Sequence, residues 1–188
     1  MNEYRAADNF LFGGRVTDVS PYGNGHINDT FAVTCVFDCG GSLRYIMQRL
    51  NANVFPDRDG LMRNMIAVTD LLKDAVIRDG GDPERECLRL IPTRDGKKYY
   101  TSPEGEVWRA TQFIENTDAY LVADDEEMFR DAGRAFGKFI VRPSDFDAST
   151  LFEVIPDYNN PSTPDEGFLR ALDAAVCVRA AEYPEEMS

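Results

Sequence analysis

A glycine-rich turn carries the only histidine of this 188-residue chain. In the stretch "PYGNGHINDTFAV", the triplet Gly23, Asn24 and Gly25 directly precedes His26, and a strand-like run follows. Glycine lets the backbone approach a phosphate closely, and an imidazole that titrates near neutral pH suits contact with phosphate or a hydroxyl group. A plain turn, in which His26 hydrogen-bonds the turn backbone, uses the same residue types. Position alone leaves both interpretations open.

Two polar residues, Gln48 and Arg49, are adjacent at the end of the run "LRYIMQRL". Successive side chains of a strand point to opposite faces, so at most one of the two can face a ligand directly. Arg49 has the charge for phosphate contact, whereas Gln48 shares its parity with Ile46. The pattern does not choose between them, and both remain candidates.

The elements that must position these residues begin with three strands within residues 11–50, the last two joined at the turn "DCGGS". Apolar residues then recur at helical spacing in "FPDRDGLMRNMIAVTDLLKDAVIRDGG". Asp57 or Asp59 can cap this helix of about five turns, and Gly80 and Gly81 end it. Three short strands follow, in "ECLRLIPT", "KKYYTS" and "EVWRATQFI".

This order predicts an α+β fold, with a mostly antiparallel sheet of about five or six strands and one long helix against it. After the stretch "ENTDAY", which ends at residue 120, the pattern becomes helical. We expect a helix within 124–143, a short amphipathic piece near 147–158 and a third helix over about residues 166–183.

The predicted layout is that of a kinase small lobe, in which a glycine-rich loop covers nucleotide phosphates. The segments "YGNGHINDTFAV", "YIMQRLNANVFPDRDGLMRN", "WRATQFIENT" and "FRDAGRAFGKF", with "SDFDASTL" beyond, add a specific resemblance. In this order, from about residue 10 to 155, the chain resembles the N-terminal half of the N-acetylhexosamine 1-kinase group. That group belongs to the aminoglycoside phosphotransferase superfamily, which is choline- and protein-kinase-like.

The resemblance implies transfer of the ATP γ-phosphoryl group to the anomeric hydroxyl of an N-acetylhexosamine or related sugar, with Mg²⁺. It places Tyr22, Gly23, Asn24 and Gly25 over the phosphates. It directs His26 and Asn28 toward the sugar or phosphate. It puts Gln48 and Arg49 where many kinases have a lysine. It assigns the hinge beside adenine to Phe113, Ile114, Glu115 and Asn116.

The resemblance divides the chain into a nucleotide-binding lobe, residues 1–116, and the first helices of a truncated large lobe, residues 117–188. A catalytic loop of the form H-x-D-x-x-x-x-N is absent, since no histidine follows His26. We therefore expect this chain alone to bind nucleotide weakly at most and to transfer no phosphoryl group. We nominate no catalytic residue and no Mg²⁺ ligand in it, and we expect self-association through exposed apolar surface.

Two other functions remain open. One keeps the superfamily but changes the acceptor to another small hydroxylated molecule, such as an aminoglycoside, choline or homoserine. The other is a stand-alone small lobe that acts as a non-catalytic nucleotide-binding or interaction module.

Composition limits the partners and the compartment. The net charge of −13 would repel nucleic acid. No apolar run approaches the roughly 18–20 residues of a membrane span, and the start lacks the layout of a secretory signal. The four cysteines form no CxxC pair, which favours reduced thiols. We expect a cytoplasmic protein.

Overall fold

The computed structural model describes residues 2–118, 120, 122–123, 125–156 and 158. The chain divides into two compact units, Met1–Val154 and Ile155–Ser188. The first unit has an α+β fold, as predicted. The predicted third helix, 166–183, lies outside the described residues, and the predicted division after residue 116 stays a prediction.

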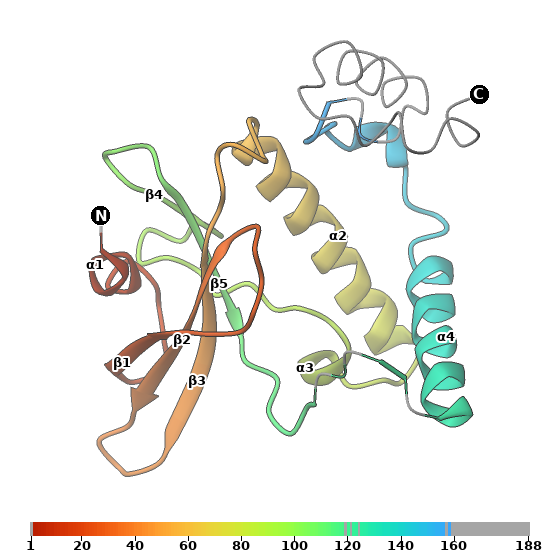
Figure 1. The fold of residues 1–188 in the computed structure, drawn as a ribbon, viewed down its shortest axis with the longest axis horizontal. Helices are drawn as coiled ribbons and strands as arrows, with labels where there is room; N and C mark the ends of the chain where they lie inside the picture. The colour runs from red at the N-terminus through yellow and green to blue at the C-terminus, as the bar shows by residue number, and fades with distance from the viewer. Residues whose placement is uncertain (1, 119, 121, 124, 157, 159–188) are drawn as a thin grey trace, which may run out of the picture. The chain divides into compact units, whose positions relative to one another are not determined.

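A five-stranded antiparallel sheet forms the centre of the first unit (Figure 1). Its strands lie in the order β1-β2-β3-β5-β4. Their bounds are Arg15–Pro21 for β1, Asp29–Val36 for β2, Ser42–Arg49 for β3, Tyr100–Thr101 for β4 and Val107–Gln112 for β5. The three predicted N-terminal strands are confirmed. So is the hairpin turn between β2 and β3, where Gly40 and Gly41 both take positive φ.

The register between β3 and β5 decides which side chains share a face. Gln48 pairs with Arg109, and Ile46 pairs with Thr111, so these four side chains lie on one face. Met47, which alternates with them, belongs to the opposite face and is fully buried.

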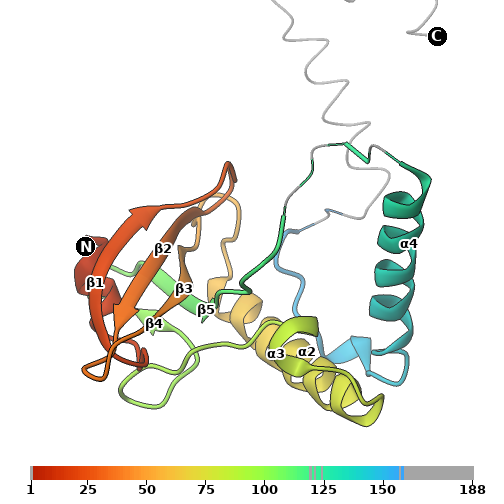
Figure 2. The same cartoon turned by 90° about the horizontal axis from the view of Figure 1, so that it is seen from below.

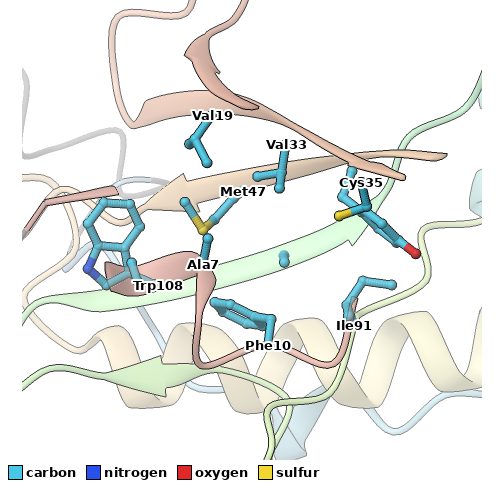
Figure 3. Packing of buried hydrophobic residues seen from close by; sticks show 11 residues of the cluster. Ala7, Phe10, Val19, Val33, Cys35, Met47, Ile91 and Trp108 are labelled. Atoms are coloured by element: carbon cyan, nitrogen blue, oxygen red, sulfur yellow. The ribbon is translucent and has the colours of Figure 1, made fainter. Parts of the chain in front are cut away.

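The main core covers that second face. Its sheet residues pack against the short helix α1 (Glu3–Ala7) and the segment that follows it. Figure 3 shows Ala7 and Phe10 facing Met47 and Val33 of the sheet. The sequence pattern did not predict α1, because five residues are too few to show a helical period. Its start is fixed by Asn2, whose side chain accepts a hydrogen bond from the Arg5 amide at 3.0 Å.

The long helix α2 (Arg58–Arg78) lies on the other side of the sheet from α1 (Figure 2). Asp57 caps it by accepting a hydrogen bond from the Gly60 amide at 2.8 Å. Met62 of α2 is fully buried in a second core cluster with Leu50, Leu90 and Val107. The helix and its cap are confirmed, although 21 residues make about six turns rather than five.

The strand predicted in "ECLRLIPT", residues 86–93, is wrong. Asp82 instead caps a short helix, α3 (Pro83–Glu86), because its side chain accepts from the Glu84 amide and a proline suits the first helical turn. Beyond it, only isolated bridges form at Leu90 and Thr93. Pro92 lies between them and has no N–H for a strand ladder.

The helix predicted within 124–143 is confirmed as α4 (Glu126–Val141). It begins at Asp125, which caps the Met128 amide, and a 3₁₀ turn, η1 (Ala148–Thr150), follows later. Arg142, just after α4, forms ion pairs with Asp79 and Glu86. Within the described part of the chain, no helix is long and apolar enough to cross a membrane.

The core assignment predicts unequal effects of two truncations on β3. Met47→Ala removes a side chain with no exposed surface and should lower the free energy of unfolding by about 2–5 kcal/mol. Leu43→Ala, on the same face but 47% exposed, should lower it by less than about 1 kcal/mol. Urea denaturation measures both values, and equal losses would contradict the position of the core.

Candidate functional site

A cavity of about 340 Å³ lies against the face of the sheet that α1 does not cover. We name it the strand-face cavity. Its lining residues come from the segment just after β1, from β3, from α2, from the segment after α3, from β5 and from the segment after β5. The described residues that line it are Tyr22, Ile46, Gln48, Met65, Leu88, Arg109, Thr111, Gln112, Phe113, Ile114 and Thr117. Its volume falls in the range of about 300–1,000 Å³ that small-molecule sites occupy.

Four of the residues nominated from the sequence meet in this cavity: Tyr22, Gln48, Phe113 and Ile114. They come from three stretches that are far apart in the chain. Antiparallel pairing places β3 next to β5, which brings Gln48 to the strand that leads into Phe113. Tyr22 joins them from the first hairpin, where its amide donates to the Thr30 carbonyl at 2.9 Å.

Gln48 is held on both sides of its amide group. Its Nε2 donates to Thr30 Oγ1 at 3.0 Å, and its Oε1 accepts hydrogen bonds from Arg109 Nε and Nη2 at 3.0 and 2.9 Å. The orientation of the amide follows from this network. Gln48 is thus a fixed part of the cavity wall.

Arg49 lies on the opposite face of β3 and does not line the strand-face cavity. It forms ion pairs with Asp29 and Glu106, at 2.6 and 2.8 Å, and its guanidinium lies 5.7 Å from the centre of the Trp108 ring. The sequence left open which of Gln48 and Arg49 faces the ligand. Because successive side chains alternate between the two faces of a strand, Gln48 lines this cavity and Arg49 does not.

The outer edge of the cavity is aromatic and charged. The rings of Tyr22 and Phe113 meet edge to face with centroids 5.4 Å apart, and the Arg44 guanidinium lies 3.8 Å from the centre of the Phe113 ring. Arg44 also binds the Glu115 carboxylate, with Nε 2.9 Å from Oε1. The hydrogen bond from Arg44 holds the pKa of Glu115 below its ordinary value.

The segment after β5 leaves backbone donors open. The Ile114 carbonyl accepts from Thr117 Oγ1 at 3.0 Å, and the Glu115 carbonyl accepts from Arg85 Nη1 at 3.0 Å. The amides of Ile114 and Glu115 donate to no other described residue. Asn116 takes φ of 55°, which turns the chain away after this edge. N–H groups that have no described partner beside a cavity can bind a flat heterocycle.

A second cavity, of about 570 Å³, lies beside the end of the glycine-rich loop, and we name it the loop cavity. Gly25, His26, Asn28 and Arg49 line it, near the end of β3 and the β4–β5 turn. His26 is exposed and makes no hydrogen bond to another described residue, so the turn-backbone bond considered above is not seen. Asn28 has a structural bond, since its Oδ1 accepts from the Asn51 amide at 3.0 Å.

The glycines between Tyr22 and His26 are not required by packing. A Cβ at Gly23 or Gly25 would meet no atom within 4 Å, although the φ of +78° at Gly23 favours glycine. Asn24, between them, is exposed and lines neither cavity. No described residue therefore packs against the loop at Gly23 and Gly25, and a ligand could approach its backbone there.

The sequence pattern did not nominate Arg109, Thr111, Ile46 or Met65 for the site. The available signal was the alternation in "EVWRATQFI", which puts Arg109 and Thr111 on the same face as Phe113. This alternation does not identify the site unless the register between β3 and β5 is known. Gln48 and Arg109 are 61 positions apart, so their pairing does not affect the local sequence pattern.

Metal binding and known families give no further assignment. Among the residues that the structure describes, no group of three His, Cys, Asp or Glu side chains could hold a metal ion. A scan against protein-family models finds none that matches the chain.

The Arg44–Glu115 pair predicts a pH dependence. Because Arg44 stabilises the carboxylate, Arg44→Gln should raise the pKa of Glu115 toward the ordinary value of about 4.3. The stabilisation by this pair is present above the ordinary pKa and is lost as pH falls through the lowered pKa of the folded state. Carboxyl NMR titration measures the shift.

Glu86 provides the control for this titration, because Arg142 rather than Arg44 lowers its pKa. Its pKa should stay the same in Arg44→Gln. An unchanged pKa of Glu115 in the variant would show that Arg44 does not determine it.

Proposed function

We propose that residues 1–116 form the nucleotide-binding small lobe of an ATP-dependent phosphotransferase, with the strand-face cavity as the nucleotide site. The observation that carries the proposal is the meeting of Tyr22, Gln48, Phe113 and Ile114 in one cavity. They were nominated from three separate stretches of the sequence for contact with the same ligand. An α+β unit with a five-stranded antiparallel sheet and one long helix is compatible with a kinase-like small lobe.

The cavity fits a nucleotide in its chemistry. Adenine would lie between Ile46 and the segment after β5, where Ile114 lines the cavity and the amides of Ile114 and Glu115 donate to no other described residue. The phosphates would extend toward the open loop of Tyr22, Gly23, Asn24 and Gly25. Bound ATP supplies the γ-phosphoryl group. Among the described residues no group of three His, Cys, Asp or Glu side chains could hold a metal ion, and we assign no residue to Mg²⁺.

The acceptor follows from the resemblance to the N-acetylhexosamine 1-kinase group. We propose the anomeric hydroxyl of an N-acetylhexosamine or related sugar as acceptor. His26 supports this choice, because it is exposed on the loop cavity, next to the loop that would cover the phosphates. An imidazole there can donate to or accept from a sugar hydroxyl or a phosphate oxygen.

Nucleotide binding tests the proposal directly. Isothermal titration calorimetry on the chain should detect saturable binding of ATP and of adenosine. Ile46→Trp, which fills the cavity from β3, should weaken both by about tenfold or more, a loss of at least about 1.4 kcal/mol. Thermal unfolding of the free variant checks that it remains folded.

Leu43→Trp is the matched control, since Leu43 is exposed on the same strand and lines neither cavity. It should leave both affinities within about twofold of the wild type, a change of well under 1 kcal/mol. Absence of binding at millimolar nucleotide, or equal effects of the two tryptophans, would overturn the proposal.

A second proposal concerns α4, whose apolar residues lie on the surface. Phe129, Phe136 and Ile140 are 74%, 70% and 70% exposed, and no described residue of α4 is buried. Two such helices related by a twofold axis would bury both stripes against each other. We therefore propose that the chain self-associates through α4.

Sedimentation equilibrium tests this proposal. The wild-type mass should rise above 21.2 kDa with concentration. Phe136→Ser should lower this association by about tenfold or more, because it removes an aromatic contact from the stripe. Glu127→Ser, at the polar start of the same helix, should not. A wild-type chain that stays monomeric at high concentration would rule out the contact.

A further inference from the structure

Arg109 is a cation that the rest of the described structure does not neutralise. Its guanidinium touches only uncharged groups: Gln48 Oε1 through Nε and Nη2, and Met65 Sδ, which lies 2.9 Å from Nη1. The two arginines of β3 do have carboxylate partners: Arg44 pairs with Glu115, and Arg49 pairs with Asp29 and Glu106. No described carboxylate lies within ion-pair distance of Arg109.

The burial of Arg109 makes its positive charge energetically unfavourable. Burial lowers the pKa of Arg109, with no opposing carboxylate to raise it. A charge withdrawn from water is normally retained only where a counter-charge compensates it. An amide oxygen and a thioether sulfur supply no counter-charge. An anion would supply it.

The position of Arg109 shows where such an anion would lie. Of the described residues that line the strand-face cavity, Arg109 alone carries a formal charge. A guanidinium has five N–H donors, and its contacts with Gln48 and Met65 use three of them, which leaves two. The remaining wall is uncharged, partly apolar or aromatic and partly polar through Gln48, Thr111, Gln112 and Thr117, so the cavity combines one cation with an uncharged wall.

We propose that Arg109 is the phosphate-binding cation of the strand-face cavity, and that Gln48 positions it. This inference rests on the proposed nucleotide site and names the residue that would hold the anionic part of the ligand. Gln48 occupies the position where a β3 cation was expected, but its amide is engaged by Thr30 and Arg109. The positive charge lies one strand away, directly opposite in register.

Three variants and three probes test the assignment on the whole chain. The probes are adenosine, ATP and inorganic tripolyphosphate, titrated by calorimetry. Arg109→Gln should weaken the binding of ATP and of tripolyphosphate by about tenfold to a hundredfold, which is the range for losing a hydrogen-bonded charge. The affinity for adenosine should stay within about threefold of the wild-type value. Arg109→Lys should recover part of the loss. Arg89→Gln is the control. Arg89 also donates to a glutamine, but it pairs with Glu84 and does not line the cavity.

The stability of the free chain separates a binding role from a structural one. Arg109→Met should leave the urea midpoint unchanged or raise it, because it removes an uncompensated charge and fills similar volume. A clear fall in the midpoint, together with equal losses for all three probes, would show that Arg109 is structural and overturn the proposal.

The probes also distinguish the two proposals. If adenosine binds but Arg109→Gln leaves tripolyphosphate and ATP unaffected, the assignment of Arg109 fails and the nucleotide site stands. If tripolyphosphate binds in an Arg109-dependent way while adenosine does not, the anion site stands and the nucleotide proposal fails. If the wild type binds none of the probes, both fail.

Discussion

The antiparallel pairing of β3 with β5 is the constraint on which the rest of the structure depends. Its register sets Met47 beside Ala110 on one face and Gln48 beside Arg109 on the other. The first pair belongs to the main core, which α1 and the following segment cover. The second pair forms part of a cavity wall. A slip of one residue would exchange the two faces, burying the polar pair in the core and exposing Met47.

The same register explains the different environments of two adjacent residues. Arg49 turns toward carboxylates and the Trp108 ring, where its charge is compensated. Gln48 turns toward the cavity, where it accepts from a guanidinium that has no described carboxylate partner. This difference in charge compensation is the reason why we propose a structural role for Arg49 and a binding role for Arg109 on the neighbouring strand. A cavity with an otherwise uncharged wall and one cation without a described carboxylate partner suits a ligand that is flat at one end and anionic at the other.

Much of the fold could be predicted from local patterns. The alternation in residues 15–49, the cap at Asp57 and the apolar period of α2 each depend on neighbours in the chain. The strand expected in 86–93 was wrong because Asp82 and Pro83 begin a helical turn and Pro92 interrupts pairing. The helix α1 has only five residues, which is too few to show a helical period of apolar residues in the sequence.

The candidate site could be predicted only in part. Motifs nominated Tyr22, Phe113 and Ile114, and the structure places them in one cavity. The choice between Gln48 and Arg49, and the nomination of Arg109, depend on which strands pair and in which register. Strand pairing and register are determined by contacts between residues far apart in the chain, so a short stretch of sequence does not reveal them.

One measurement tests most directly whether the strand-face cavity is the nucleotide site. The ¹H–¹⁵N NMR spectrum of the chain would be recorded during a titration with ATP. We predict that the largest shifts fall on the amides of Ile114 and Glu115, on Ile46 and on the Arg109 side chain. Saturating shifts elsewhere, with these four groups unchanged, would contradict the assignment of the cavity. A spectrum that does not respond to ATP would contradict nucleotide binding itself.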